Sequence, residues 1–303
     1  MLSIRTTHSC TFHAGLNAIA SFYTILFADV QIIRTAIKIS EKNEQVLVVG
    51  QDVDLVVLLA ALSPDEKDIL FLKEAIGNVK QRMYSSRDLQ SSSIIRNLKK
   101  SILFIHAISG CDTTSGFFGK GKQQHVQIFN KEKDLDSIVD IFNNAKTTPE
   151  EIEKAGETFI LKLYKLQSSE GSLGEQRYAC FNKLVGQANS TVLLSKLPPT
   201  STAARQHSRR TYLQVQIWQE QPIKPDQWGW KKINNTLSPL YTTESPAPAS
   251  IMSLITCNCK QDCVKRCSCI KAGMKCTTMC GTCRGQSCSN TEHILETIGD
   301  DNI

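Results

Sequence analysis

The 303-residue chain has few cysteines outside one short region and lacks the long apolar runs of a membrane protein. Its longest apolar run, residues 53–62, is too short to span a bilayer and contains Asp54. The apolar stretch 14–28 is interrupted by Asn17 and Ser21, and no small-residue cleavage site follows it, so we do not expect a signal peptide. No segment repeats with a period of about 20–50 residues. These absences favour an intracellular protein with reduced thiols and no membrane partner.

A strong excess of charge of one sign is also missing. The chain has 35 Lys and Arg residues against 29 Asp and Glu residues, a net charge of +6, which permits an anionic partner without demanding one. Apolar residues make up 41% and charged residues 21%, as in folded globular proteins. The length allows about two domains.

The N-terminal half alternates strand and helix patterns. Residues 45–50 (QVLVVG) and the stretch that begins at Ile69 read as buried strands, separated by a helix over residues 52–63. Residues 91–109 read as one helix that ends at Gly110. This order predicts an α/β domain over residues 1–145.

The second half changes character twice. Residues 146–221 have a helical pattern that starts at the Thr148-Pro149-Glu150-Glu151 signal. Residues 222–254 hold five of nine prolines and two of three tryptophans, which predicts an extended linker whose Trp228 and Trp230 fold back as packing anchors. A cysteine module at 255–290 and a flexible tail at 291–303 follow.

Nine of the twelve cysteines lie within residues 257–288, with the spacing C-x-C-x3-C-x3-C-x-C-x6-C-x3-C-x2-C-x4-C. Nine thiolates match neither one nor two closed four-cysteine zinc sites, but they serve three zinc ions if three of them bridge. A disulfide knot would leave one thiol unpaired. Zinc is therefore the leading interpretation, with disulfides, or an iron–sulfur or copper site, as alternatives. The expected ligands are Cys257, Cys259, Cys263, Cys267, Cys269, Cys276, Cys280, Cys283 and Cys288.

The net charge of this segment favours an anionic partner. Three zinc ions with nine thiolates carry a charge of −3, and the other side chains of the segment contribute +5, so the metallated module is cationic. So short a segment buries too little apolar surface to fold alone, and metal must supply the folding energy. The basic residues available to an anionic partner here are Lys265, Arg266, Lys271, Lys275 and Arg284.

The cysteine spacing and the closing CSN resemble the tesmin-type CXC domain, a DNA-binding module of nuclear proteins, over residues 257–290. The resemblance implies three zinc ions, insertion of basic or aromatic side chains into the DNA minor groove and a nuclear location. These modules often have Tyr before the central C-x-C, where this chain has Arg266. Arginine also suits a narrow minor groove, but the sequence preference is then open. The alternative is a zinc-stabilised protein-interaction module without a nucleic-acid partner.

Carboxylates follow the first predicted strand and the end of a later helix. Asp52 and Asp54 stand just past residues 45–50, where ligand sites of α/β sheets form, and Asp112 follows Gly110. Carboxylates gathered at one sheet edge bind Mg²⁺ or Mn²⁺ for phosphodiester hydrolysis. Taken alone, D-x-D after a strand is more typical of a helix cap with a solvated charge.

In combination, GQDVDLVVLL and GCDTTSGFFGKGK resemble the PIN-like fold of the flap endonuclease and XPG family. The resemblance implies metal-ligand roles for Asp52, Asp54 and Asp112, and a DNA-gripping glycine turn that contains Lys120. Asp29 matches a further acidic position, whereas Phe27 stands where that family has Glu, and an early aspartate has no counterpart. With two carboxylates missing, we expect a truncated nuclease-like domain that is inactive or feeble. An active Mg²⁺- or Mn²⁺-dependent structure-specific nuclease is the alternative.

The chain as a whole resembles a group of invertebrate proteins of mobile-element character that end in a CXC module. The sequence thus predicts an α/β PIN-like domain, a helical segment, an extended linker and a small zinc-cluster CXC module. The leading functional hypothesis is a nuclear protein that binds double-stranded DNA with low sequence selectivity.

Overall fold

The structure of the chain is a computed structural model that divides into two compact units. The first unit joins Met1–Leu166 with Ser201–Thr242, and the second joins Gln167–Thr200 with Thr243–Ile303. The chain therefore passes between the units three times. The described residues are 2–5, 18–78, 80–132, 134–167, 171–187, 194–221, 223–233, 236–242, 244, 256–277 and 280–291.

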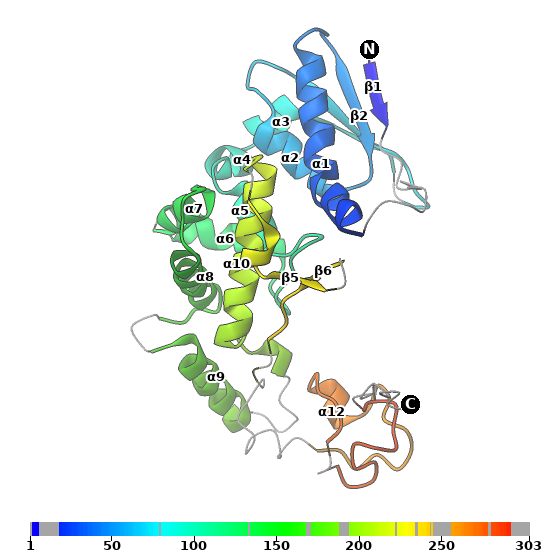
Figure 1. Cartoon of the computed structure of the whole chain (residues 1–303), viewed down its shortest axis with the longest axis vertical. Helices are drawn as coiled ribbons and strands as arrows, with labels where there is room; N and C mark the ends of the chain where they lie inside the picture. The colour runs from blue at the N-terminus through cyan, green and yellow to red at the C-terminus, as the bar shows by residue number, and fades with distance from the viewer. Residues whose placement is uncertain are drawn as a thin grey trace, which may run out of the picture. The chain divides into compact units, whose positions relative to one another are not determined.

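A four-stranded sheet forms one end of the first unit (Figure 1). Its strands run in the order β1-β2-β3-β4; β1 and β3 pair parallel to β2, and β4 pairs antiparallel to β3. The strand and helix expected at residues 45–63 and the strand expected from Ile69 are confirmed as β2, α2 and β3. The elements are β1 (Leu2–Arg5), α1 (Ala18–Ser40), β2 (Val46–Gly50), α2 (Val53–Leu62), β3 (Ile69–Lys73) and β4 (Arg82–Ser85).

The helix expected at residues 91–109 is broken in two. The first part, α4 (Ser93–Leu98), begins at Ser92, whose hydroxyl accepts the amide of Ile95. A turn follows, in which the amide of Ser101 donates to the carbonyl of Leu98 (2.8 Å). The second part, α5 (Ile102–Ile108), lies within the core of the unit. The other helices of this region are α3 (Ser86–Ser91), α6 (Lys122–Lys131) and α7 (Leu135–Asn143).

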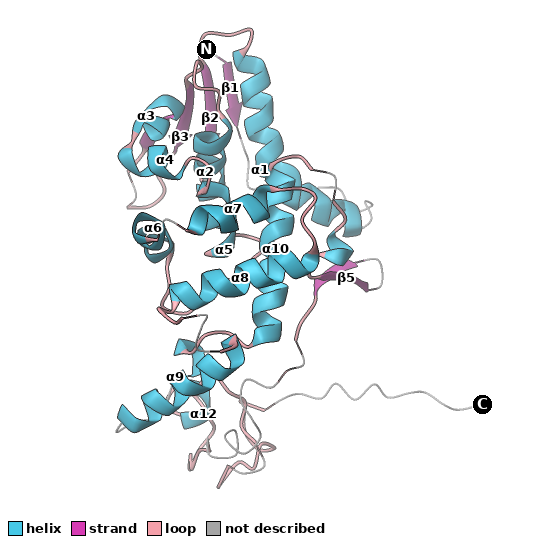
Figure 2. Cartoon of the chain, turned by 90° about the vertical axis from the view of Figure 1, so that its left-hand side faces the viewer, coloured by secondary structure: helices cyan, strands magenta, loops and turns pink. Residues whose placement is uncertain are grey.

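Two long helices, α8 (Pro149–Leu163) and α10 (Ser201–Trp218), pack with α5 and α7 in a mostly helical part of the first unit (Figure 2). The start expected at Thr148 is confirmed, because Thr148 and Glu151 form a capping box at the head of α8. Helix α8 packs on α10 at very short range: a Cβ at Gly156 would lie 1.9 Å from the Ser208 hydroxyl. The predicted boundary at residue 145 thus falls inside one unit.

The Pro- and Trp-containing stretch differs from the expected extended linker. Residues 223–233 and 236–242 contain a 3-10 turn, η3 (Pro225–Gln227), and two strands that pair antiparallel, β5 (Trp230–Ile233) and β6 (Thr236–Pro239). Trp228 and Trp230 are buried in the core of the first unit, and the Trp228 ring lies 4.3 Å from that of Tyr212. The tryptophans do fold back on the helices, and their burial draws the stretch into the unit.

The second unit contains a helix from the middle of the chain together with the cysteine module. Helix α9 (Leu173–Gln187) and the short η2 (Leu194–Lys196) come from the insert between α8 and α10. In its described residues, 256–277 and 280–290, the cysteine module has one short helix, α12 (Ser268–Lys271), and is otherwise turns and loops. Among the described residues, no helix combines the length and apolar character needed to cross a bilayer. The predicted tail, residues 291–303, lies outside the described residues apart from Thr291.

Candidate metal centres

The thiols of residues 257–288 form a buried cluster of their own. The eleven cysteines of the described residues are all free. Within the module, Cys259 and Cys288 are half-buried and the other seven are buried. These seven form a core separate from that of the first unit. Hydrophobic side chains take little part in this core; sulfur atoms fill it.

The spacing of the sulfur atoms fits a shared metal ion. Tetrahedral zinc with Zn–S bonds of about 2.3 Å requires its sulfur ligands to lie roughly 3.8 Å apart. The Sγ atom of Cys257 lies 3.7 Å from Sγ of Cys263 and 3.8 Å from Sγ of Cys276. Those of Cys269 and Cys280 lie 3.5 Å apart. A disulfide would need about 2.05 Å, so these contacts have the length expected between ligands of one ion.

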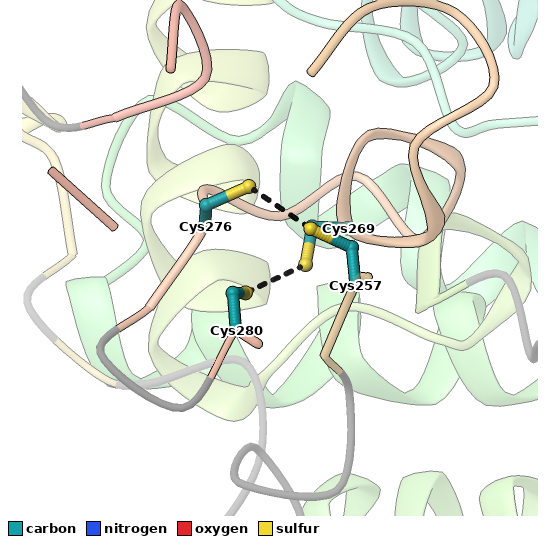
Figure 3. Close-up of side chains that lie close together, drawn as sticks. All are labelled: Cys257, Cys269, Cys276 and Cys280. Carbon is teal, nitrogen blue, oxygen red and sulfur yellow. Dashed lines mark hydrogen bonds between the residues drawn. The ribbon is translucent and has the colours of Figure 1, made fainter. Parts of the chain in front are cut away.

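The sulfur atoms gather in overlapping sets of four, each with its ligand atoms within 4.8 Å of one another. Figure 3 shows one set, whose side chains point toward one another. The Cys288 thiol interacts with those of Cys263, Cys276 and Cys283. The three sets are Cys257, Cys269, Cys276, Cys280; Cys257, Cys259, Cys263, Cys267; and Cys257, Cys263, Cys276, Cys283.

Backbone hydrogen bonds join the segments that carry these cysteines. The amide of Gly281 donates to the carbonyl of Cys257 (2.9 Å), and the amide of Cys276 donates to the carbonyl of Asn290 (2.8 Å). Gly281 also permits close packing, because a Cβ there would lie 2.1 Å from Oδ1 of Asn258. The first and last parts of the module are therefore held together around the thiols.

The buried thiols differ in how strongly they hold their protons. Burial raises the pKa of Cys257 to about 11 and raises the pKa values of Cys269 and Cys276 as well. For Cys267 and Cys280, burial acts in the same direction, but hydrogen bonds with backbone groups overcome it and lower both pKa values to about 7. A metal that binds here must displace protons, so its affinity rises with pH.

The cationic side chains of the module all face solvent. Its single acidic residue, Asp262, is tied to the backbone: Oδ1 accepts the amides of Ser289 (2.6 Å) and Cys263 (2.8 Å), which lowers the pKa of Asp262. The carboxylate thus holds the first turn to the last and leaves the surface positive. The exposed basic residues are Lys260, Lys265, Arg266, Lys271, Lys275 and Arg284.

Three carboxylates meet in the first unit. Asp29 on α1, Asp54 on α2 and Asp112 in the loop after α5 offer oxygen atoms within 4.8 Å of one another. The structure therefore brings together three of the four acidic residues selected from the sequence. The fourth, Asp52, caps α2 instead: its Oδ1 accepts the amide of Asp54 (2.9 Å).

Asp54 has a partner that the sequence did not indicate. Nε2 of His106 lies 2.7 Å from Oδ1 of Asp54, and both residues are buried. The ring of His106 stacks on Trp218 of α10, with ring centres 5.5 Å apart. His106 is thus a core histidine whose partner is this carboxylate. This buried contact fixes the position of one carboxylate oxygen of Asp54.

The loop that carries Asp112 is held from both ends. At its start, Gly110 has a φ of +109°, and a Cβ there would lie 2.9 Å from the amide nitrogen of Gly116. Past Asp112, the Thr113 hydroxyl donates to Oε1 of Gln214 on α10 (2.6 Å). The position of Asp112 thus depends on a contact between residues far apart in the sequence.

Its surroundings in the acidic cluster shift the pKa of Asp29. Burial, and then the negative charges of Asp52, Asp54 and Asp112, raise the pKa of Asp29 to about 7. At neutral pH this carboxyl is therefore partly protonated. A divalent cation would relieve the repulsion, which is the electrostatic condition for binding one.

The two lysines of the glycine turn after Asp112 contact other groups of the first unit. Nζ of Lys120 lies 5.0 Å from the centre of the Tyr164 ring. Nζ of Lys122 donates to the carbonyl of Gly110, and burial lowers the pKa of Lys122. Phe118 is exposed at the tip of the turn. Lys120, expected to contact DNA, is thus half-buried and paired with an aromatic ring.

No protein-family model matches this chain, no curated protein matches it, and no solved structure matches it. The clustered cysteines at the C-terminus are consistent with a metal-binding module, and this conclusion rests on their geometry alone.

Proposed function

We propose that the C-terminal module binds three zinc ions through its nine cysteines. The sulfur sets support one arrangement in particular. Cys288 interacts with Cys263, Cys276 and Cys283, the other three members of the third set, and can replace Cys257 there. The nine cysteines then fill all twelve ligand positions of three four-coordinate ions. Each ion then has four thiolates, and Cys257, Cys263 and Cys276 each bridge two ions. Zinc would supply the folding free energy that a sulfur core of this size lacks.

Native mass spectrometry of the full chain tests this proposal. The expected result is three zinc ions per chain, lost together with protection of the thiols from alkylation when a chelator is added. A module that is folded without zinc, or whose thiols are paired in disulfides, would refute the proposal.

We further propose that the metallated module binds double-stranded DNA in the nucleus. The observation that supports DNA binding is the exposure of all six basic side chains of the module. Its single carboxylate, Asp262, accepts hydrogen bonds from the backbone. Rigid cationic surfaces of this kind attract the DNA phosphates and release counterions. With about four phosphate contacts, affinity should fall on the order of 10²-fold between 50 and 200 mM salt.

A pair of matched variants separates DNA binding from a protein-interaction role. Lys265→Glu with Arg266→Glu reverses two exposed charges on the module, whereas Lys231→Glu with Lys232→Glu reverses two exposed charges on β5. We expect the first change to weaken duplex binding by about 10²-fold and the second by less than about 3-fold. Zinc-loaded chain without salt-dependent DNA binding would instead favour the zinc-stabilised interaction module.

A second candidate function is divalent-cation binding on a PIN-like scaffold in the first unit. The convergence of Asp29, Asp54 and Asp112, with the raised pKa of Asp29, supports it. These three carboxylates would be the ligands of Mg²⁺ or Mn²⁺, and the ion would polarise a phosphodiester and activate water. With Asp52 used as a cap, few ligands remain, so we propose feeble or absent nuclease activity.

Cleavage of flap or branched DNA in Mn²⁺ tests this candidate. Asp112→Asn should abolish any cleavage, whereas Asp226→Asn, at an exposed position in η3, should not. Cleavage that survives Asp112→Asn, or persists in chelator, would contradict a role for this cluster.

A further inference from the structure

The cysteine module packs against a helix from the middle of the chain. Ala272 and Met274 of the module form a small apolar cluster with Leu194 and Leu197 of the η2 region. All four side chains are at least nine-tenths buried. The cluster lies within the second unit and is separate from both the sulfur core and the core of the first unit.

Helix α9 supplies the rest of this surface. Cys180, Phe181 and Leu184 are partly buried against the cluster. Their spacing of one, three and four residues places them on one face of α9. Arg177, three residues before Cys180 on that face, donates from Nη1 to the carbonyl of Pro198, which joins α9 to the η2 region. The two segments thus present one continuous apolar platform.

The part of the module that contacts this platform is bracketed by zinc-ligand candidates. Cys269 lies just before the docked turn, and its carbonyl accepts the amide of Met274 (2.8 Å). Cys276 lies just after it, and Nδ2 of Asn290 donates to the carbonyl of Met274 (2.9 Å) and contacts Sγ of Cys276 (3.4 Å). The conformation that presents Ala272 and Met274 therefore depends on the same residues that would hold metal.

We infer that α9 and η2 form a docking platform for the metallated cysteine module, so that zinc binding at Cys269 and Cys276 closes an intramolecular contact between the C-terminal module and the 171–197 insert. This inference rests on the proposed zinc binding. Without metal, the turn between the two ligands loses its fixed shape and the module leaves the platform. The insert then senses the metal state of a segment that lies about a hundred residues further along the chain.

The covalent connection makes such a contact effective even when it is weak. A short covalent link gives an effective concentration on the order of 1 mM. A contact with a dissociation constant of about 10 µM would then be closed in about 99% of chains. A few buried apolar side chains suffice for docking, and loss of one of them suffices to open it.

Hydrogen exchange of the full chain, with its zinc content measured on the same samples, tests the inference. On zinc removal we expect the amides of residues 173–187 to exchange at least about 10-fold faster, because α9 loses its docked face. Alkylation of Cys180 should rise in parallel, while that of Cys111 in the first unit should not. If the chain binds no zinc, the proposed function fails. If it binds zinc but α9 and Cys180 do not respond to its removal, the docking inference alone is overturned.

Two matched variants separate docking from zinc binding. Met274→Asp places a charge in the docked turn, whereas Val264→Asp makes the same kind of change at a position that is 59% exposed on the same module. We expect both chains to keep their zinc, but only Met274→Asp to release α9. Leu184→Asp, on the platform side, should lower the zinc affinity measured by equilibrium competition with a chelator by about 10-fold, because coupling between docking and metal binding is reciprocal. Equal behaviour of the Met274 and Val264 variants with zinc retained, or an unchanged zinc affinity in the Leu184 variant, would refute the inference.

Discussion

The two candidate metal centres of this protein are built in opposite ways. The three carboxylates of the first unit come from α1, α2 and the loop after α5, and a large apolar core holds those elements in place. The nine thiols of the cysteine module are themselves the core around which their segment folds. In the first unit the apolar core positions the carboxylates. In the cysteine module the thiols themselves, with their metal, must position the surrounding chain.

This difference decides what metal does for each part. In the first unit a cation would relieve repulsion in a site that the fold already provides. In the module the metal would replace an apolar core that so short a segment cannot supply. Metal should therefore tune the stability of the first unit and create the structure of the module.

Chelation of zinc should give the largest difference between the two parts. Structural zinc contributes about 10–16 kcal/mol to the folding of small modules at neutral pH. We therefore expect amides of residues 257–291 to exchange at the rate of an unfolded chain after chelation, while the amides of α8 and α10 keep their protection. Hydrogen exchange with mass spectrometry measures both. Retained protection of the module without metal would remove the contrast.

Serine substitutions within the module should distinguish cysteines that bridge two ions from cysteines that bind one. Cys276 belongs to two four-sulfur sets, whereas Cys259 belongs to one. Cys259→Ser should cost the chain one zinc ion and leave two, while Cys276→Ser should leave one or none. Native mass spectrometry gives the counts. Equal losses for the two variants would contradict the bridging scheme.

Acid should destabilise the first unit through a buried histidine. Burial lowers the pKa of His207 from 6.5 to about 4, and its Nε2 lies 2.9 Å from the carbonyl of Ile108. Because the unfolded chain binds the proton more readily, stability is present above pH 6.5 and lost as the pH falls toward 4. The loss should reach about 3 kcal/mol. In His207→Gln the melting temperature should change less over this range, although the variant is less stable at neutral pH. Parallel pH profiles for the two chains would argue against His207 as the cause.

The carboxylate cluster should give an effect of opposite sign. This effect should be smaller, because Asp29 is half-buried and solvent screens the repulsion that acts on it, whereas His207 is buried. The pKa of Asp29 is raised from 3.8 to about 7, so this group favours folding below pH 3.8 and loses that contribution as the pH rises through 7. In metal-free protein at about pH 8, Asp29→Asn should raise the melting temperature by about 2–4 °C, and by less at about pH 5. Mn²⁺ should stabilise the wild-type chain and not the variant. Equal Mn²⁺ stabilisation of both chains would exclude Asp29 as a ligand.

Strong local patterns were predictable from the sequence, and long-range contacts were not. The apolar run of β2 and the Thr148 capping signal are local, and both elements form where expected. Strand β1 has only four residues and depends on pairing with β2 for its identity. The break between α4 and α5 was missed because Lys99 and Lys100 are good helix formers that a turn overrides here.

The candidate sites show the same limit. Asp54 and Asp112 could be selected because each follows a recognisable element, and Asp29 through a family resemblance. The partnership of His106 with Asp54 joins residues 52 positions apart, and no local pattern indicates it. The nine cysteines could be grouped as ligands from spacing alone, but their distribution over three sets depends on how the loops cross.

The contact between the Met274 turn and α9 also has a consequence for limited proteolysis. Helix α9 is covalently joined to the first unit at both of its ends, whereas the cysteine module is joined only through residues 243–255. A single cut in that stretch would leave two peptides with no covalent bond between them. With zinc present, the two peptides should co-elute at concentrations well above about 10 µM and separate on dilution, because the cut removes the high effective concentration.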